Sequence, residues 1–180
     1  MTLKFNYKNK NIFITGATGR IGKKLSLKFA SMNANLILID INFDKLKNLR
    51  RKLIKKTSGK ISIFNCNFLV ENEIIELCNK IKKKKLKIDI ILNNAAFTGG
   101  TQITGWNTSF LNQEYKTFNK ALAVNLSAIF LIVKKLKNVL NQSKYPSIIN
   151  IASIYSIIAP DYNMYKKTDE FNPAAYGASK

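Results

Sequence analysis

Short apolar runs alternate along the chain with segments in which apolar residues recur every three or four positions. The runs are rich in β-branched residues and almost entirely apolar inside, which is typical of strands buried on both faces. Because helical segments separate them, the pattern predicts a doubly wound α/β fold in which a parallel sheet lies between two helical layers. The five predicted strands are Asn11–Thr15, Asn35–Asp40, Lys60–Asn65, Ile88–Asn93 and Pro146–Ser153.

The spacing of the other apolar residues predicts the helices. Two helices carry apolar stripes, which are Leu46, Leu49 and Leu53 in one and Ile74, Leu77 and Ile81 in the other. The longest is predicted over about 113–140. Its stripe is Tyr115, Phe118, Leu122, Leu126, Ile129, Val133, Leu136 and Leu140. No repeat or linker interrupts the series. We therefore expect residues 1–180 to form one domain, which is incomplete at its C-terminus because a last helix has only just begun.

Composition shows a strongly basic chain. Its 180 residues include 27 Lys, 24 Ile and 22 Asn, and the formal net charge is +20. Such a charge usually suggests nucleic acid or an anionic membrane as a partner. Only three of the basic residues are Arg, however, and Lys is spread over nearly every polar face. We interpret the charge as compositional, and expect neither a specific nucleic-acid partner nor a membrane partner.

The residue types present exclude several kinds of chemistry. No run approaches the ~18 apolar residues that span a bilayer, and Met1–Asn11 lacks a signal-peptide core, so we expect a cytoplasmic protein. The chain has no His, and Cys66 and Cys78 lack metal-ligand spacing. We therefore expect no metal site and no His-based triad, and other residues must provide any acid–base chemistry.

A glycine-rich turn follows the first predicted strand. The segment Thr15–Gly22 reads Thr-Gly-Ala-Thr-Gly-Arg-Ile-Gly and runs into a helical pattern, as in turns that hold a pyrophosphate on a helix N-terminus. Asp40 lies 18 residues beyond Gly22, close to the spacing of an acid that accepts from an adenosine ribose. A carboxylate there also repels a 2′-phosphate and favours NAD over NADP. The alternatives are a plain strand–helix turn, and Asp40 as the cap of a helix beginning near Asp44.

Three further motifs lie farther along the chain. Asn93-Asn94-Ala95-Ala96 follows the fourth strand, Ser153 ends the fifth, and Tyr176 and Lys180 form Tyr-x-x-x-Lys. With the glycine-rich turn and Asp40, these motifs resemble the short-chain dehydrogenase/reductase family in order and spacing. The resemblance implies a Rossmann fold with strand order 3-2-1-4-5 and an NAD(P)-dependent oxidoreductase acting on CH–OH groups. It also implies NAD as cofactor, a small alcohol or ketone as substrate, and a homo-oligomer at full length.

The resemblance also implies roles for individual residues. Tyr176 is the general acid/base, Lys180 holds the nicotinamide ribose and lowers the tyrosine pKa, Ser153 fixes the substrate oxygen, and Asn125 holds a relay water. A free phenol has a pKa of about 10, so it needs a nearby positive charge to cycle protons near neutrality. Lys180, four residues on, shares a helical face with Tyr176. The implied cofactor-binding residues are Gly16, Thr18, Gly19, Arg20, Ile21, Gly22, Asp40, Asn67, Asn94, Ala95, Ala96, Tyr176 and Lys180.

The chain departs from the family pattern at two positions near the cofactor. Arg20 replaces the second glycine of many short-subunit members, and the frame Gly16-x-x-Gly19-x-x-Gly22 resembles the family's sugar-nucleotide-modifying branch. An epimerase or dehydratase of that branch is therefore one alternative, and an inactive fragment or nucleotide-binding module is another. Asn67 stands where the family commonly places an Asp, and its amide oxygen still accepts a hydrogen bond.

Two long connections distinguish the chain. Ser153 and Tyr176 are 23 residues apart, so we expect the segment from Ala159 to Asn172 to form a lobe over the active site, with Ser156 as the alternative to Ser153. The connection from Phe97 to Asn112 carries Gly99, Gly100 and the only tryptophan, Trp106. Trp106 either lines a substrate pocket or pins the loop to the domain. Similar loops in the family make a sugar-like substrate our preferred expectation.

Overall fold

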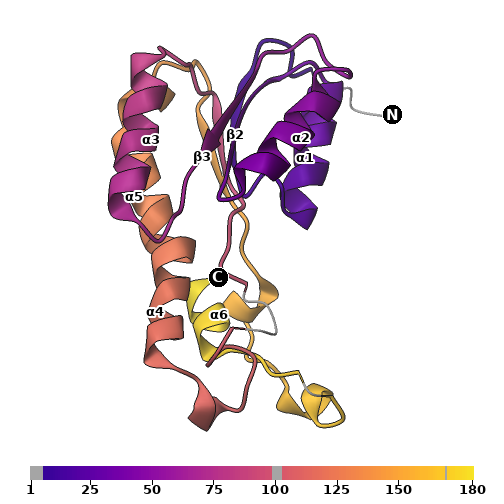
Figure 1. Ribbon diagram of the computed structural model, residues 1–180, viewed down its shortest axis with the longest axis vertical. Coiled ribbons are helices and arrows are strands. Elements are labelled where there is room, and N and C mark those ends of the chain that lie inside the picture. Colours follow the sequence, from indigo (N-terminus) through magenta and orange to yellow (C-terminus); the bar gives the residue numbers. More distant parts are fainter. Residues whose placement is uncertain (1–5, 99–102, 169) are drawn as a thin grey trace. The chain divides into compact units, whose positions relative to one another are not determined.

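The computed structural model describes residues 6–98, 103–168 and 170–180, so Gly99 and Gly100 lie outside the described residues. The chain forms two compact units (Figure 1). Unit 1 comprises Met1–Ala95 and Leu131–Asn150, and unit 2 comprises Ala96–Phe130 and Ile151–Lys180. Each unit is described by itself below.

A parallel five-stranded sheet organises unit 1. Its strands are β1 (Asn11–Thr15), β2 (Asn35–Asp40), β3 (Ile61–Asn65), β4 (Ile90–Asn93) and β5 (Ser147–Asn150), in the order β3-β2-β1-β4-β5. The predicted order and the boundaries of the first two strands are confirmed. The register places Thr15 beside Ile39, and Asp40 beside Asn65. The carboxyl ends of β1, β2 and β3 therefore meet at one edge of the sheet.

Helices cover both faces of this sheet. Figure 1 shows α1 (Arg20–Ser31) and α2 (Phe43–Leu53) on one side, and α3 (Glu71–Lys83) and α5 (Ala128–Leu140) on the other. The predicted three-layer α/β/α arrangement is thus confirmed. The stripes predicted for α2 and α3 are buried, as expected.

The core of unit 1 lies in its central strands. Ile12, Phe13 and Ile14 of β1 are fully buried, which follows from helices covering both faces. Burial of each such side chain contributes about 1.5–3 kcal/mol. The outer strand differs: Ile148 and Ile149 of β5 are 42% and 39% exposed. Among the described strands, β5 pairs with β4 alone, so one edge of the sheet is uncovered there.

Unit 2 is built from short helices around a small aromatic core. Trp106 is 4% exposed and meets the ring of Phe97 edge-on, with centroids 5.0 Å apart. Ala121, Ala175 and Tyr176 pack in the same cluster. Trp106 therefore pins the long connection to the core of this unit, as one of the two sequence-based alternatives predicts. The helices of unit 2 are η1 (Phe110–Asn112), α4 (Tyr115–Leu122), the π-helical η2 (Ala123–Ser127), η3 (Ile154–Ser156), η4 (Tyr162–Tyr165) and α6 (Ala174–Ser179).

The apolar stripe predicted for the longest helix is confirmed at Leu136 and Leu140 and wrong at Tyr115 and Leu126. The helix begins at Tyr115, which is 82% exposed, and Leu126 is 48% exposed. The prediction followed the largest apolar side chains, whereas in the first half of the helix small and polar residues are the buried ones. The π-helical turn also inserts one residue and shifts the face. The buried positions are Thr117, Ala121, Asn125, Ala128, Ile132, Leu136, Val139 and Leu140.

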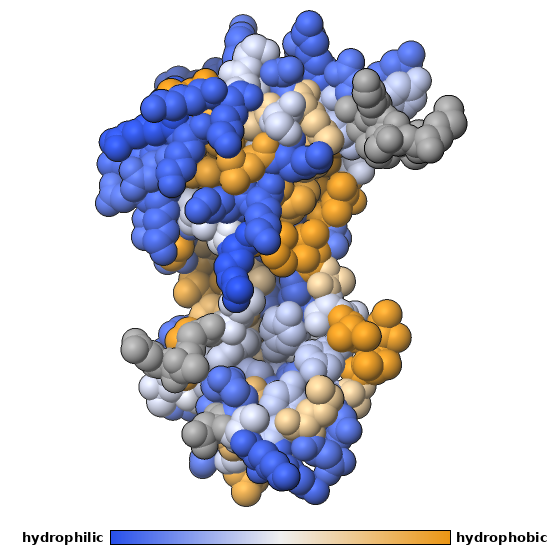
Figure 2. All heavy atoms as spheres, turned by 90° about the vertical axis from the view of Figure 1, so that its right-hand side faces the viewer, coloured by the Kyte–Doolittle hydropathy of each residue, from blue (hydrophilic) through white to orange (hydrophobic). Residues whose placement is uncertain are grey.

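The surface mixes hydrophilic and apolar side chains. On the face shown in Figure 2, hydrophilic residues spread widely with apolar groups between them, as the dispersed lysines of the sequence suggest. None of the helices described here is both long enough and apolar enough to cross a membrane.

Candidate functional site

The glycine-rich turn after β1 requires glycine at two of its positions. Gly16 has φ +61°, and a Cβ there would lie 2.8 Å from Ala95 Cα. A Cβ at Gly22 would lie 2.1 Å from the Gly16 carbonyl oxygen. Gly19 is less constrained, because a Cβ there would lie 3.3 Å from the same oxygen. Close backbone packing therefore explains the glycines at both ends of the turn.

The N-terminus of α1 presents free backbone donors. Gly19 is its N-cap, and no side chain caps the helix. Within the described part of the chain, the N–H groups of Arg20, Ile21 and Gly22 have no hydrogen-bond acceptor. These donors and the positive end of the helix dipole can bind an anionic group. The turn therefore fits the pyrophosphate of a dinucleotide.

Asp40 ends β2 beside this turn. Its Oδ2 accepts from the Thr18 N–H at 2.9 Å, and its Oδ1 accepts from the Asn42 N–H at 3.1 Å. The alternative role as a helix cap is wrong, because the N-cap of α2 is Asn42, whose side chain accepts from the Lys45 N–H. Each carboxylate oxygen keeps a second lone pair that can accept from a ribose hydroxyl.

The segment after β4 is tied to the end of β1. The Asn94 amide Nδ2 donates to the carbonyl oxygens of Thr15 and Gly16, at 2.9 and 3.0 Å. The Thr15 Oγ1 accepts from the N–H groups of Asn94 and Ala95, at 3.0 and 2.9 Å. Sequence reasoning missed Thr15, although a polar residue ending an apolar strand was an available signal. These bonds hold the glycine-rich turn in place.

Asn67 follows β3 at the same edge of the sheet. Its Oδ1 accepts from the Leu69 N–H at 3.0 Å, and its own N–H donates to Glu73 Oε2 at 2.7 Å. A second lone pair on Oδ1 leaves Asn67 able to accept from an adenine amino group.

Asn125 lies in the π-helical segment of unit 2. Its Oδ1 accepts from the Phe97 N–H at 2.6 Å, and its Nδ2 donates to Ser179 Oγ at 2.8 Å. The side chain is 3% exposed. Single π-helical turns occur frequently at functional sites because they redirect one side chain. Here the redirected amide joins the start of the long connection to α6.

The helix α6 carries Tyr176, and Lys180 follows directly as its C-cap. The Lys180 ammonium donates to the Ile151 carbonyl oxygen, and burial lowers the pKa of Lys180. Tyr176 is half-buried against the aromatic core. Ser179, which sequence reasoning missed, connects Asn125 to this helix and also donates to the Tyr176 carbonyl oxygen at 3.4 Å.

The structure corrects the position of Ser153. The strand β5 ends at Asn150, so Ser153 does not end the strand but caps η3. Its Oγ accepts from the Tyr155 N–H at 3.3 Å, a local bond that favours a turn over continued β structure. Ser156 Oγ donates to the Ser153 carbonyl oxygen at 2.6 Å. The helix α6 packs against η3.

A pair of tyrosines lies in the same unit. The hydroxyls of Tyr155 and Tyr165 are 3.0 Å apart. This hydrogen bond, followed by burial, raises the pKa of Tyr155. Tyr155 was not among the predicted site residues, because its pairing joins loop positions ten residues apart and follows no helical or strand period. The lobe is also joined to the first long connection, where the Phe171 N–H donates to Asn107 Oδ1 at 2.7 Å.

The predicted residues thus divide between the units. Unit 1 brings together the turn at 16–22, Asp40, Asn94 and Ala95. Unit 2 contains Ala96 and all four proposed catalytic residues, with Asn125 bonded toward α6 and Lys180 bonded two residues before Ser153. The first group can hold a dinucleotide, and the second can hold and transfer a proton.

Neither cysteine is placed for chemistry. Cys66 and Cys78 are both free and buried, and burial raises their thiol pKa values to about 12 and about 11. The described residues contain no cluster of His, Cys, Asp or Glu side chains that could hold a metal ion.

Comparisons with known proteins identify a sequence family that matches the chain. The sequence model of the short chain dehydrogenase family matches residues 10–180. A short chain dehydrogenase/reductase, dpfgG, from Gibberella zeae is 30% identical over 146 residues, covering 80% of this chain and 51% of the relative. More generally, the chain spans about half to two thirds of the length of the first curated relatives it matches.

Solved structures share the fold. An NAD⁺-bound xylitol dehydrogenase superposes with a TM-score of 0.80 at 24% identity, covering 98% of this chain and 61% of the other. A short chain dehydrogenase from Shigella flexneri complexed with NADP gives a TM-score of 0.81 at 22% identity, covering 98% and 69%.

Proposed function

The chain belongs to the short chain dehydrogenase family, and we propose that the full-length protein is an NAD(H)-dependent oxidoreductase that interconverts a secondary alcohol and a ketone. One observation carries the proposal. On α6, a half-buried tyrosine is followed four residues later by a lysine whose ammonium is held against the Ile151 carbonyl. A phenol can donate a proton to a substrate oxygen, and an ammonium one helical turn away can stabilise the phenolate that results.

Unit 1 would hold the cofactor, which supplies or accepts the hydride when bound. Gly16 and Gly22 let the backbone approach the pyrophosphate, and the free N–H groups at the start of α1 donate to it. Asp40 would accept from the adenosine ribose. Because its carboxylate opposes a 2′-phosphate, we infer a preference for NAD(H) over NADP(H).

Tyr176 would hold and move the proton. In the reduction direction its hydroxyl donates to the ketone oxygen, and in the oxidation direction its phenolate accepts the alcohol proton. A phenol with a pKa of about 10 does this near neutrality only where positive charge stabilises the phenolate. Lys180 supplies that charge one helical turn away, and its desolvated ammonium gains from an anionic neighbour.

Ser153 and Asn125 would support this transfer differently. Ser153 Oγ accepts from the Tyr155 N–H, which leaves its own proton free for a substrate oxygen. Asn125 uses its amide on Phe97 and Ser179. We therefore assign Asn125 as a positioning residue that holds α6, in addition to the relay role that the family resemblance implies.

We propose a hydroxylated, sugar-like ketone as the substrate class. The segment after Ser153 carries the paired hydroxyls of Tyr155 and Tyr165, which can exchange hydrogen bonds with substrate hydroxyls. The similarity to a xylitol dehydrogenase is compatible with a polyol-type substrate. The sugar-nucleotide epimerase alternative rests only on the glycine spacing, and the family match favours the short-chain branch.

The decisive experiment replaces Tyr176 by Phe in the full-length protein. We expect turnover of sugar-like ketones with NADH to fall by roughly 10³-fold, the scale of a lost general acid, while NADH affinity stays within about twofold. The matched control is Tyr115→Phe, which removes an exposed hydroxyl from the same unit. Near-normal turnover of Tyr176→Phe would refute the assigned proton donor.

Cofactor preference has a separate test. Fluorescence titrations of the full-length protein with NADH and NADPH should show tighter NADH binding. Asp40→Asn should narrow the difference, because it removes the charge that opposes the 2′-phosphate. Asp44→Asn, which removes an exposed acid at the start of α2, serves as the control. Equal or tighter NADPH binding by the unmodified protein would overturn the preference.

A further inference from the structure

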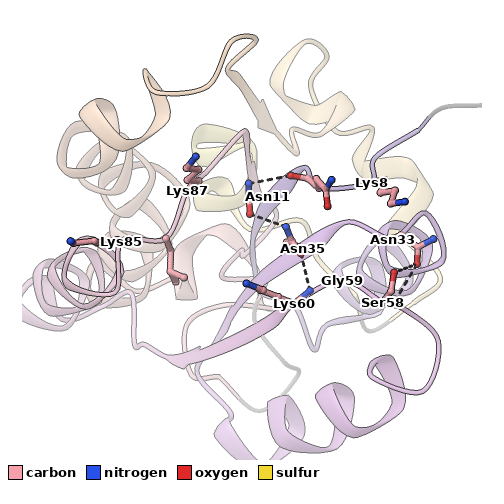
Figure 3. Close-up of a pocket in the computed structure, with 11 residues that line it drawn as sticks. Lys8, Asn11, Asn33, Asn35, Ser58, Gly59, Lys60, Lys85 and Lys87 are labelled. Atoms are coloured by element: carbon pink, nitrogen blue, oxygen red, sulfur yellow. Dashed lines mark hydrogen bonds between the residues drawn. The ribbon is translucent and has the colours of Figure 1, made fainter.

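Unit 1 contains a concave site at the amino ends of its strands, separate from the glycine-rich turn. It is a cavity of about 420 Å³, at the sheet edge opposite the glycine-rich turn (Figure 3). Because β1 is five residues long, the two edges are separated by roughly 13 Å of strand. The cofactor residues described above therefore do not line this cavity.

The floor of the cavity is a chain of polar groups that crosses the strand ends. Asn35 Nδ2 donates to Asn11 Oδ1 at 3.2 Å, and Asn35 Oδ1 accepts from the Lys60 N–H at 2.8 Å. Asn11 is itself held by Asp89, whose Oδ2 accepts from its N–H and its Nδ2, both at 2.8 Å. The amides are thereby fixed in orientation before any ligand arrives.

Lysines surround this floor. Figure 3 shows Lys8, Lys60 and Lys87 near the Asn11–Asn35 pair, and Lys85 farther out with its ammonium directed away from the pair. No carboxylate lines the cavity, and none of the four ammonium groups forms an ion pair with the residues that the structure describes. Leu86 is the single apolar residue of the lining.

The charged groups around the cavity favour an anion, although some negative charge lies nearby. The C-terminal ends of α1, α2 and α3 lie at this edge, and each contributes roughly half a negative charge. Asp89 is adjacent, but both its oxygens already accept hydrogen bonds, from Asn11 and from Ser143. Asp89 stays ionised, so roughly one and a half of the four ammonium charges remain once its charge and the three helix ends are subtracted.

We propose that this cavity binds a small polyanion of the phosphate class, in which several phosphate groups are linked. The lysines supply the positive charge, because the Ser58 and Lys60 N–H groups already donate to Asn33 and Asn35. A linked phosphate chain can meet several lysines at once, whereas a single phosphate meets fewer. The site is independent of the proposed oxidoreductase function.

The test is calorimetric titration of the chain with inorganic tripolyphosphate, with orthophosphate for comparison. We expect saturable 1:1 binding of tripolyphosphate that is at least tenfold tighter than that of orthophosphate and weakens as salt is raised. Saturating NADH should leave this binding unchanged. Displacement by NADH would assign the binding to the cofactor turn and overturn the proposal.

Matched variants locate the site. Lys60→Gln combined with Lys87→Gln should weaken tripolyphosphate binding at least tenfold. Lys116→Gln combined with Lys120→Gln removes the same charge from α4 and should change binding less than twofold. An equal loss in both double variants would show that the charge acts diffusely. Circular dichroism should show unchanged melting of each variant, since all four side chains are at least partly exposed.

Lysine acetylation read by mass spectrometry provides a second readout that does not depend on the variants. Tripolyphosphate should protect Lys60 and Lys87 and leave Lys116 and Lys120 unprotected. A short single-stranded oligonucleotide serves as the competing partner. If it binds more tightly than tripolyphosphate and protects lysines throughout the chain, a general nucleic-acid surface replaces the proposed pocket.

Discussion

The two units of this protein hold their functional residues by different means. In unit 1, backbone hydrogen bonds between five registered strands set the positions of the glycine-rich turn and Asp40. In the described part of unit 2 there is no strand, and short helices are joined by side chains such as Asn125 and Asn107 that bond to distant backbone. The proposed cofactor half thus rests on the register of the sheet, with side-chain bonds from Asn94, Thr15 and Asp40 added at the turn, and the proposed proton-transfer half rests on individual side chains.

This difference predicts where each unit is sensitive to substitution. A sheet tolerates changes of surface side chains but not an added atom where two backbones touch. A set of short helices tolerates small changes of backbone but not the loss of a buried bridging amide such as that of Asn125, whose partners have few substitutes. Substitutions in the two units should therefore differ in the size of their effects.

The largest effect is expected at a backbone contact in unit 1. Gly22→Ala places a methyl 2.1 Å from the Gly16 carbonyl oxygen, so the turn must move. We expect a loss of about 3 kcal/mol in the free energy of unfolding, measured by denaturant titration, and weaker NADH binding. Gly19→Ala, with its nearest contact at 3.3 Å, should cost much less. Equal costs would mean that close packing does not define the turn.

The second effect concerns the bridging amide of unit 2. Asn125→Ala leaves the Phe97 N–H and Ser179 Oγ without their partner in a buried place, at a cost of about 2 kcal/mol. Trp106, the only tryptophan, lies in unit 2, so its fluorescence reports on that unit. We expect the fluorescence transition to shift to lower denaturant. An unchanged transition would contradict the bridging role.

A smaller, pH-dependent effect is expected at Asp89. Burial raises the pKa of this carboxyl, but hydrogen bonds from Ser143 and Asn11 outweigh burial, so the pKa lies below its ordinary value. The stabilisation is therefore present above about pH 4 and lost as the pH falls through the folded-state pKa. Asp89→Asn should cost about 1 kcal/mol at pH 7. In melts at acid pH, the difference in unfolding free energy between Asp89→Asn and the unmodified chain should shrink. A difference that does not change with pH would argue against a stabilising role of the ionised carboxylate.

The smallest effect is a gain in stability. Lys85 follows α3 with φ +50°, a left-handed conformation that costs about 1 kcal/mol for a residue with a side chain. Lys85→Gly should raise the unfolding free energy by about 0.5 kcal/mol, because the relief exceeds the entropy that glycine adds to the unfolded chain. Lys84→Gly, at φ −79°, relieves no strain and should destabilise. Stabilisation by both variants would exclude backbone strain as the cause.

Some features followed from local pattern alone. The apolar runs predicted the bounds of β1 and β2 to the residue. A strand buried on both faces is almost entirely apolar, so its composition identifies it without knowledge of the neighbouring strands. The motif Thr15–Gly22 placed the glycines where steric contact now explains them. The spacing of Asp40 correctly predicted its position beside the turn. The reason is that the register of two parallel strands fixes which of their ends meet.

Other features were decided only by the folded chain. The π-helical turn at Asn125, the end of β5 before Ser153 and the tyrosine pair of the lobe depend on contacts between residues far apart in sequence. The basic cavity likewise collects Lys8, Lys60 and Lys87 from three separate loops, which charge counting could not group. Local pattern determines periodic elements because their hydrogen bonds are local or repeat regularly, whereas sites in loops arise from single long-range contacts that carry no period in the sequence.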